Sequence, residues 1–306
     1  MAGLAVVPLT AGIWSHPALH WAGVQWLALA ASCDSSTDIG RVESTQRGHV
    51  AQEWRDGRGG APFIDLADIT GVDERSSLLE VGCGTGQGTR SLGALGCKVT
   101  AVELGSNMAV LARRRIAEFP NIEVETSSFE DWGDRGRRFD AVVAAASWHW
   151  VDPSIGWSKA HCVLKPSGWL AVLGHVVVRR LDEPGVYAET IDLHERFAPG
   201  NPGWGHPPLE DEVRLTGEGW GPPNEDSEGL FGATVVRWYP TAQWFDGEGF
   251  ADLLRSNSLY RRLEDEVREP LLDAVADRIR TRMGDRVARH YLCGLRVGQR
   301  AGGSAS

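Results

Sequence analysis

The sequence predicts an α/β fold built around a mostly parallel β-sheet. From residue 78 onward, short apolar runs alternate with amphipathic stretches, which is typical of β-α-β units that place helices over a parallel sheet. The first apolar run leads directly into a glycine-rich turn at residues 82–86, and this turn opens a helix. A length of 306 residues with 42% hydrophobic content allows one large domain, or one domain carrying a substantial lid, rather than two full-size domains.

The apolar runs and turn residues define the expected elements in order. Strands are expected at residues 77–81, 98–103, 122–126, 140–145 and 169–177, with helices between them at 88–95, 107–119 and 154–164. The second helix has Ser106 or Asn107 as its cap and ends before Pro120, because proline cannot continue a helix. Beyond residue 177 we expect a helix at 185–197, a strand at 233–239, helices at 247–257 and 264–283, and a last strand at 287–297.

Three segments fall outside this alternation. Residues 200–229 are crowded with Gly, Pro and acidic residues, so the insertion at about 185–232 contains a long loop that is either a lid or disordered. Residues 1–41 form an extension whose apolar run, 18–31, is too short to cross a bilayer. Three alternatives remain open for this extension: a hydrophobic flap over the core, a poorly ordered segment, or non-native sequence. The domain itself is expected at 42–299, followed by a disordered tail at 300–306.

Charge and cysteine content exclude some classes of protein. A formal net charge of −10 is the opposite of the basic surface expected of a protein that neutralises a phosphate backbone, so a nucleic-acid partner is disfavoured. No membrane partner is expected either, because the apolar run at 18–31 is too short to cross a bilayer. Five scattered cysteines without a CxxC pair indicate reduced thiols in a cytoplasmic protein, and no metal site is expected.

The glycine-rich turn has the features of a ligand-binding loop. Missing side chains let a ligand approach the backbone, and the helix N-terminus supplies free N–H donors. The dinucleotide fingerprint requires a glycine three residues after the second of its pair, but this sequence has Gln87 or Thr89 there, which disfavours NAD. Glu103 ends the second expected strand, the place where an acid accepts hydrogen bonds from ribose hydroxyls in adenosine-binding sheets.

Glu80 followed by Gly82, Gly84 and Gly86 resembles the first motif of class I S-adenosylmethionine-dependent methyltransferases. The resemblance extends over roughly residues 45–299 and includes the segment 163–170, which is similar to the family's turn before the fifth strand. It implies a seven-stranded Rossmann-like sheet in the order 3-2-1-4-5-7-6, with only the last strand in sequence antiparallel and helices on both faces. It also implies that the turn wraps the methionine part of the cofactor and that Glu80 lies near its amino group.

The resemblance assigns further cofactor contacts. Ser128 occupies the position where the family usually has an acid that contacts the adenine amino group, and Phe129 is expected to supply its backbone N–H and an apolar face. Arg58 loosely matches a segment that closes over the cofactor, which makes it a candidate partner for the cofactor carboxylate.

The fourth expected strand runs into Ser147-Trp148-His149-Trp150, similar to a small-molecule subgroup that has a His-Trp motif facing the transferred methyl group. His149 is therefore the candidate catalytic residue, with His206 and His175 next, although a packed and hydrogen-bonded ring is the alternative. The expected activity is methyl transfer to an O, N or C atom of a small molecule, and the expected setting is specialised metabolism. A non-catalytic S-adenosylmethionine-binding regulator and, less favoured, a nicotinamide-dependent oxidoreductase are the alternatives.

Overall fold

The computed structural model describes residues 60–183, 185–200, 207–216 and 229–302. Its centre is a seven-stranded sheet in the order β3-β2-β1-β4-β5-β7-β6, which confirms the predicted strand order. The strands are β1 (Ser77–Val81), β2 (Lys98–Glu103), β3 (Ile122–Thr126), β4 (Phe139–Ala145), β5 (Leu164–Val178), β6 (Phe231–Phe245) and β7 (Val287–Arg300). The pairs among β1 to β5 are parallel, and β7 runs antiparallel to both β5 and β6, as predicted.

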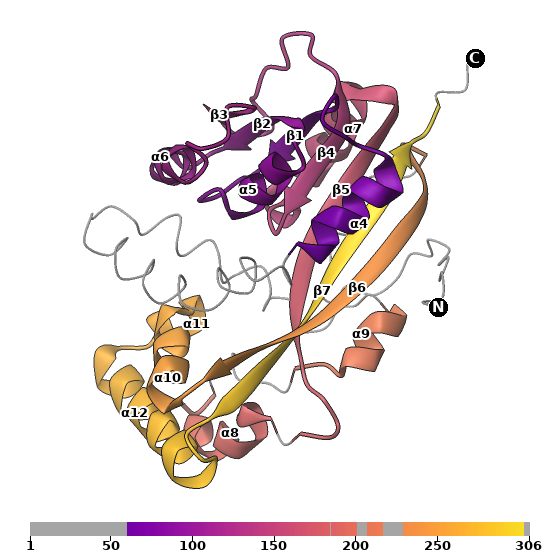
Figure 1. The fold of residues 1–306 in the computed structure, drawn as a ribbon. Helices are drawn as coiled ribbons and strands as arrows, with labels where there is room; N and C mark the ends of the chain where they lie inside the picture. Colours follow the sequence, from indigo (N-terminus) through magenta and orange to yellow (C-terminus); the bar gives the residue numbers. More distant parts are fainter. Residues whose placement is uncertain (1–59, 184, 201–206, 217–228, 303–306) are drawn as a thin grey trace.

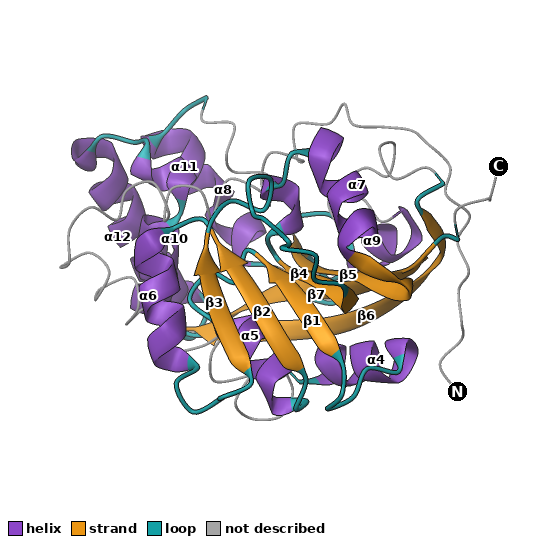
Figure 2. Ribbon diagram, turned by 90° about the horizontal axis from the view of Figure 1, so that it is seen from above, coloured by secondary structure: helices purple, strands orange, loops and turns teal. Residues whose placement is uncertain are grey.

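Helices cover both faces of the sheet, because the buried strands are apolar on both sides. Helices α4 (Ala61–Thr70), α5 (Gln87–Ala94) and α6 (Ser106–Arg115) lie on one face, and α7 (Pro153–Val163) lies on the other (Figure 2). The core under α4 and α5 contains Leu78, Ala141, Leu173 and Leu295. The core under α7 contains the alternate strand residues, such as Leu79 and Val142, as the two-residue period of a strand requires.

The strands β5, β6 and β7 are much longer than the other four and reach past them to a separate helical layer (Figure 1). This layer consists of α8 (Val186–Phe197), α10 (Gly247–Ser256), α11 (Ser258–Arg261) and α12 (Asp265–Arg282), and its core is built around residues such as Phe250 and Leu272. Val287 and Phe245, at this end of β7 and β6, belong to the same core. The three long strands therefore connect two helical layers.

Several predicted boundaries were wrong. The loop predicted at 200–229 contains a helix, α9 (Glu210–Thr216), whose Val213 packs on Val176 and Leu292. The fifth strand begins at Leu164, because residues 165–168 bulge out of its ladder with β4 between Leu164 and Trp169. Helix α4 was not predicted.

Two further predictions concern the ends and the insertion of the chain. The predicted insertion at 185–232 includes α8, which packs against α12 through an ion pair between Asp192 and Arg278. The predicted extension at 1–41 lies outside the described residues. Among the described helices, none combines the length and apolar character needed to span a membrane.

Candidate functional site

The turn after β1 adopts a backbone that favours glycine at three alternating positions. Gly82, Gly84 and Gly86 have φ angles of 68°, 57° and 84°, all in the left-handed region that side chains rarely adopt. A Cβ atom on Gly82 would lie 2.5 Å from Cβ of Ser147, so glycine there lets the ends of β1 and β4 approach each other. A Cβ atom on Gly84 would meet only the tip of Met108 at 3.8 Å, which leaves its backbone open to a ligand.

Glu103, at the end of β2, clamps this turn. Its Oε2 accepts a hydrogen bond from the N–H of Gly84 at 2.7 Å, and its Oε1 accepts one from the N–H of Gly105 at 2.8 Å. Each carboxylate oxygen has two lone pairs, so both bonds leave acceptor capacity for ribose hydroxyls. The ribose contact is predictable from the sequence, whereas these two hydrogen bonds to the turn are not.

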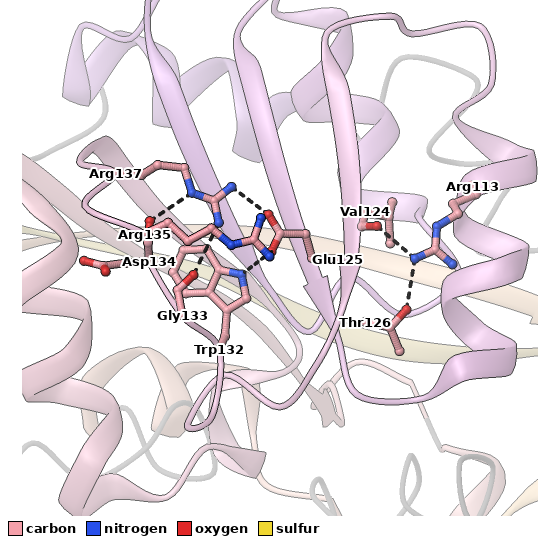
Figure 3. A network of polar contacts seen from close by, with 9 residues as sticks. All are labelled: Arg113, Val124, Glu125, Thr126, Trp132, Gly133, Asp134, Arg135 and Arg137. Atoms are coloured by element: carbon pink, nitrogen blue, oxygen red, sulfur yellow. Dashed lines mark hydrogen bonds and ion pairs between the residues drawn. The ribbon is translucent and has the colours of Figure 1, made fainter.

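Two arginines of α6 brace the same region. Arg115 Nη1 donates to the carbonyl oxygen of Thr85 at 3.1 Å and to its Oγ1 at 2.7 Å, which ties α6 to the glycine turn. Arg113 Nη2 donates to the carbonyl oxygen of Val124 and to Oγ1 of Thr126, each at 2.9 Å (Figure 3). Arg113 is exposed and Arg115 is half-buried, so both side chains form these contacts at the surface of α6.

Glu80 is a buried carboxyl group beside the turn. Only 1% of the residue is exposed, and Oε2 has no hydrogen-bond partner within the described part of the chain. Burial raises the pKa of Glu80 to about 7, the hydroxyl of Thr89 opposes this rise, and the charge of Glu103 adds to it. Buried polar groups are normally satisfied, so this oxygen fits a cationic ligand group such as the ammonium of the methionine part of the cofactor.

The side chains predicted to contact adenine have local partners instead. Ser128 Oγ donates to Oδ2 of Asp131 at 2.8 Å and accepts from its N–H at 3.0 Å, so this hydroxyl closes a turn. The ring of Phe129 is 4% exposed and packs 6.1 Å from the ring of Trp148 in the core under α7. The predicted apolar face of Phe129 is therefore turned into the core, and its backbone is the part left to contact a ligand.

A polar network holds the loop that follows β3 (Figure 3). Glu125 accepts hydrogen bonds from Arg137 Nη1 at 2.6 Å and from Trp132 Nε1 at 3.0 Å, and the guanidinium of Arg137 lies 4.9 Å over the ring of Trp132. The hydrogen bond from Arg137 is the main cause of the lowered pKa of Glu125. Because the middle and the far end of the loop are tied to Glu125 of β3, its backbone is fixed at the predicted adenine side of the site.

The end of β4 directs His149 toward the same edge of the sheet. Ala146 has a φ of 56°, which is strained for a residue with a side chain, and its N–H donates to the carbonyl oxygen of Leu173 at 2.8 Å. Ser147 Oγ donates to the carbonyl oxygen of Val81. The short helix η2 (Trp148–Trp150) follows, with Trp148 buried and His149 exposed.

The His149 ring is not a core ring, which disfavours the packed alternative. It lies against Trp150 with the ring centroids 4.5 Å apart, and nearby protein atoms desolvate it enough to lower its pKa. The pKa of His175, on β5, falls to about 4 through burial and then through the charges of Arg289 and His149. A neutral imidazole can accept a proton, but a pKa of about 4 makes His175 a weak base at neutral pH, so His149 is the better candidate of the two. Two other predicted residues, Arg58 and His206, lie outside the described residues.

Comparison with known proteins agrees with this geometry. Residues 79–172 match the family described as "Methyltransferase domain". The chain is 28% identical over 144 residues to trans-aconitate 2-methyltransferase of Mycobacterium tuberculosis, which covers 42% of this chain and 52% of that protein. It is 32% identical over 117 residues to demethylmenaquinone methyltransferase of Tropheryma whipplei, covering 38% of this chain and 48% of that protein.

These alignments span only about half the length of the curated relatives that the chain matches. Among solved structures, a Haemonchus contortus phosphoethanolamine N-methyltransferase aligns with a TM-score of 0.41 at 15% identity, covering 79% of this chain and 52% of that one.

Proposed function

We propose that this chain is a class I S-adenosylmethionine-dependent methyltransferase that methylates a small molecule. The family match and the strand order support this proposal. The observation that carries the proposal is the buried Oε2 of Glu80, which has no described partner and lies beside a turn whose Gly84 is open to a ligand. An uncompensated buried carboxyl group is costly, so its retention favours a cationic ligand at this position.

The cofactor, when bound, supplies an electrophilic methyl group on a sulfonium. Glu80 would hold its ammonium, the backbone of residues 82–86 would surround the methionine part, and Glu103 would accept hydrogen bonds from the ribose. Ser128 and Phe129 would contribute backbone contacts to adenine. The fixed loops after β2 and β3 support this role, because a prearranged site lowers the entropy cost of alignment.

At the acceptor, we assign His149 as the residue that takes a proton. An amine reacts once it is neutral, whereas a hydroxyl requires a base, and a neutral imidazole at the end of β4 meets this need. The acidic chain favours a small molecule over a nucleic acid. The names of the trans-aconitate and demethylmenaquinone relatives support a small-molecule acceptor as well, and a role in specialised metabolism in the cytoplasm stays our prediction.

Calorimetry with S-adenosylhomocysteine tests the cofactor site, and a screen with methyl-labelled S-adenosylmethionine against a metabolite extract tests the reaction. We expect S-adenosylhomocysteine to bind and NAD not to bind, followed by label transfer to a small molecule. Binding without transfer to any acceptor would favour a non-catalytic regulator. Preferential binding of NAD would overturn the proposal in favour of an oxidoreductase.

A further inference from the structure

The long strands carry a second group of buried polar side chains, away from the glycine turn. In the sheet ladder His175 of β5 and Tyr239 of β6 both pair with Cys293 of β7, so the three residues form a row across the strands. Alternation along β7 puts Tyr291 and Arg289 on the same face as Cys293. We refer to these five residues as the polar strip.

The polar strip lies between the two helical layers on one face of the sheet. Toward the cofactor end the next residue on this face of β7 is Leu295, which belongs to the core under α4 and α5. Toward the other end the next residue is Val287, in the core of α8, α10 and α12. His175 comes two residues after Leu173, which pairs with Ala145 at the end of β4. The His175 end of the strip therefore lies near the edge of the sheet that carries His149.

Arg289 is the exceptional member of the strip. It is 4% exposed, its Nε has no hydrogen-bond partner, and no carboxylate within the described ranges forms an ion pair with it. Its guanidinium lies 5.1 Å from the ring centroid of Tyr291 and is hydrogen-bonded to Tyr291 and to Tyr187 of α8, and Tyr260 of α11 interacts with it electrostatically. A buried cation surrounded by tyrosines rather than by acids costs free energy unless an anion is supplied.

We propose that Arg289 binds an oxyanion of the methyl acceptor, either a carboxylate or a phosphate, and so selects acceptors of this chemical class. This inference rests on the proposed function. Guanidinium groups bind such anions through two parallel hydrogen bonds, and the Nε of Arg289 has no partner among the described residues to give up. Arg289 and Cys293 are four residues apart, about 14 Å along a strand, so the anion is held away from the atom that receives the methyl group.

Calorimetry with three probes of similar shape tests the inference on protein saturated with S-adenosylhomocysteine. The probes are benzoate, phenyl phosphate and uncharged benzamide. We expect at least one of the two anions to bind at least about tenfold more tightly than benzamide. The anion with the higher affinity shows whether the site prefers a carboxylate or a phosphate. Arg289→Gln should weaken that anion roughly 30-fold, the lower range for removing one partner of a buried charge pair. Arg289→Lys should weaken it less, because a lysine keeps the charge and loses the paired geometry.

The matched control is Arg296→Gln, which changes an arginine on the opposite face of the same strand and should leave anion binding unchanged. Equal binding of benzamide and both anions to the wild-type protein would overturn the inference and leave the proposed function intact. Failure of S-adenosylhomocysteine to bind would instead reject the proposed function. If Arg289→Gln does not fold, the anion affinity of Arg289→Lys is the test. An affinity equal to that of the wild type would overturn the inference.

Discussion

Replacing Glu80 by Gln should stabilise the ligand-free protein at pH 8 while weakening its cofactor site. The variant keeps the shape of the side chain and removes the charge. The pKa of Glu80 rises from 4.5 to about 7 in the folded protein, mainly through burial. Between these values the folded state holds a proton that the unfolded state has lost, so stability falls as the pH rises through this window.

The magnitude follows from the two pKa values. At about 1.4 kcal/mol for each unit of pKa, ionised Glu80 costs about 3 kcal/mol of folding free energy above pH 7. Urea unfolding at pH 8 should therefore show a free energy of unfolding up to about 3 kcal/mol higher for Glu80→Gln than for the wild type. At pH 5 the wild-type side chain is protonated, so the gain should fall below about 1 kcal/mol.

Ligand binding should show the opposite sign. Only ionised Glu80 can pair with the ammonium of S-adenosylhomocysteine, so the wild-type affinity should rise about eightfold from pH 6 to pH 7.5. Calorimetry at pH 6 in buffers of different ionisation enthalpy should detect release of about one proton on binding. Glu80→Gln should bind with an affinity that does not change over this range, and about 1.5 to 3 kcal/mol more weakly than the wild type at pH 7.5.

Glu123→Gln is the control, because Glu123 is an exposed glutamate on β3 and its loss should change neither property. The reasoning fails if Glu80→Gln is less stable than the wild type at pH 8, or if wild-type affinity is independent of pH. Either result would mean that the buried carboxyl group is already compensated in the ligand-free protein.

Other predictions test the remaining site residues. Gly84→Val should abolish S-adenosylhomocysteine binding, since a branched side chain would enter the open space beside the turn and strain its backbone; unchanged affinity in a folded variant would refute the assignment of the turn. Glu103→Ala should weaken binding by roughly 1.5 to 3 kcal/mol by calorimetry, and a loss under about tenfold would argue against a ribose contact. Once an acceptor is known, His149→Ala should lower turnover by about 100-fold or more with little change in cofactor affinity or melting temperature; a lower melting temperature with normal turnover would indicate a packing role. Deleting residues 1–40 should leave a folded, cofactor-binding protein, and an insoluble product would contradict this.

The sequence predicted the parts of the fold that local pattern determines. The bounds of β1, β2 and β3 agree with the prediction to the residue, because each is a short apolar run closed by a turn. The start of β5 was placed five residues late, at 169 instead of Leu164. The end of β6 was placed six residues short, at 239 instead of Phe245, since its outer half mixes polar and apolar residues, and Phe245 is buried in the core of the helices beyond. Such burial depends on tertiary contacts and leaves no periodic signal in the chain.

The same distinction applies to the site. The three glycines were predictable because only glycine suits their backbone. The clamp by Glu103 joins residues 19 positions apart, and Arg115 reaches back 30 positions to Thr85, so neither contact has a signature in the sequence. Arg289 was not singled out either, because an isolated arginine on a strand gives no hint that it is buried without an acid.

The continuous ladder from β5 through β7 to β6 has a mechanical consequence. Ten consecutive residue pairs join β5 to β7, from Trp169 with Gln299 to Val178 with His290, and they span both helical layers. A hinge between the layers would have to break these backbone hydrogen bonds, so the described helical layer cannot swing away from the cofactor turn as a rigid flap. With the proposed function, exchange of acceptors would rely on segments outside the ladder. We then expect substitutions on α8 or α11 to change acceptor choice without shifting the glycine turn.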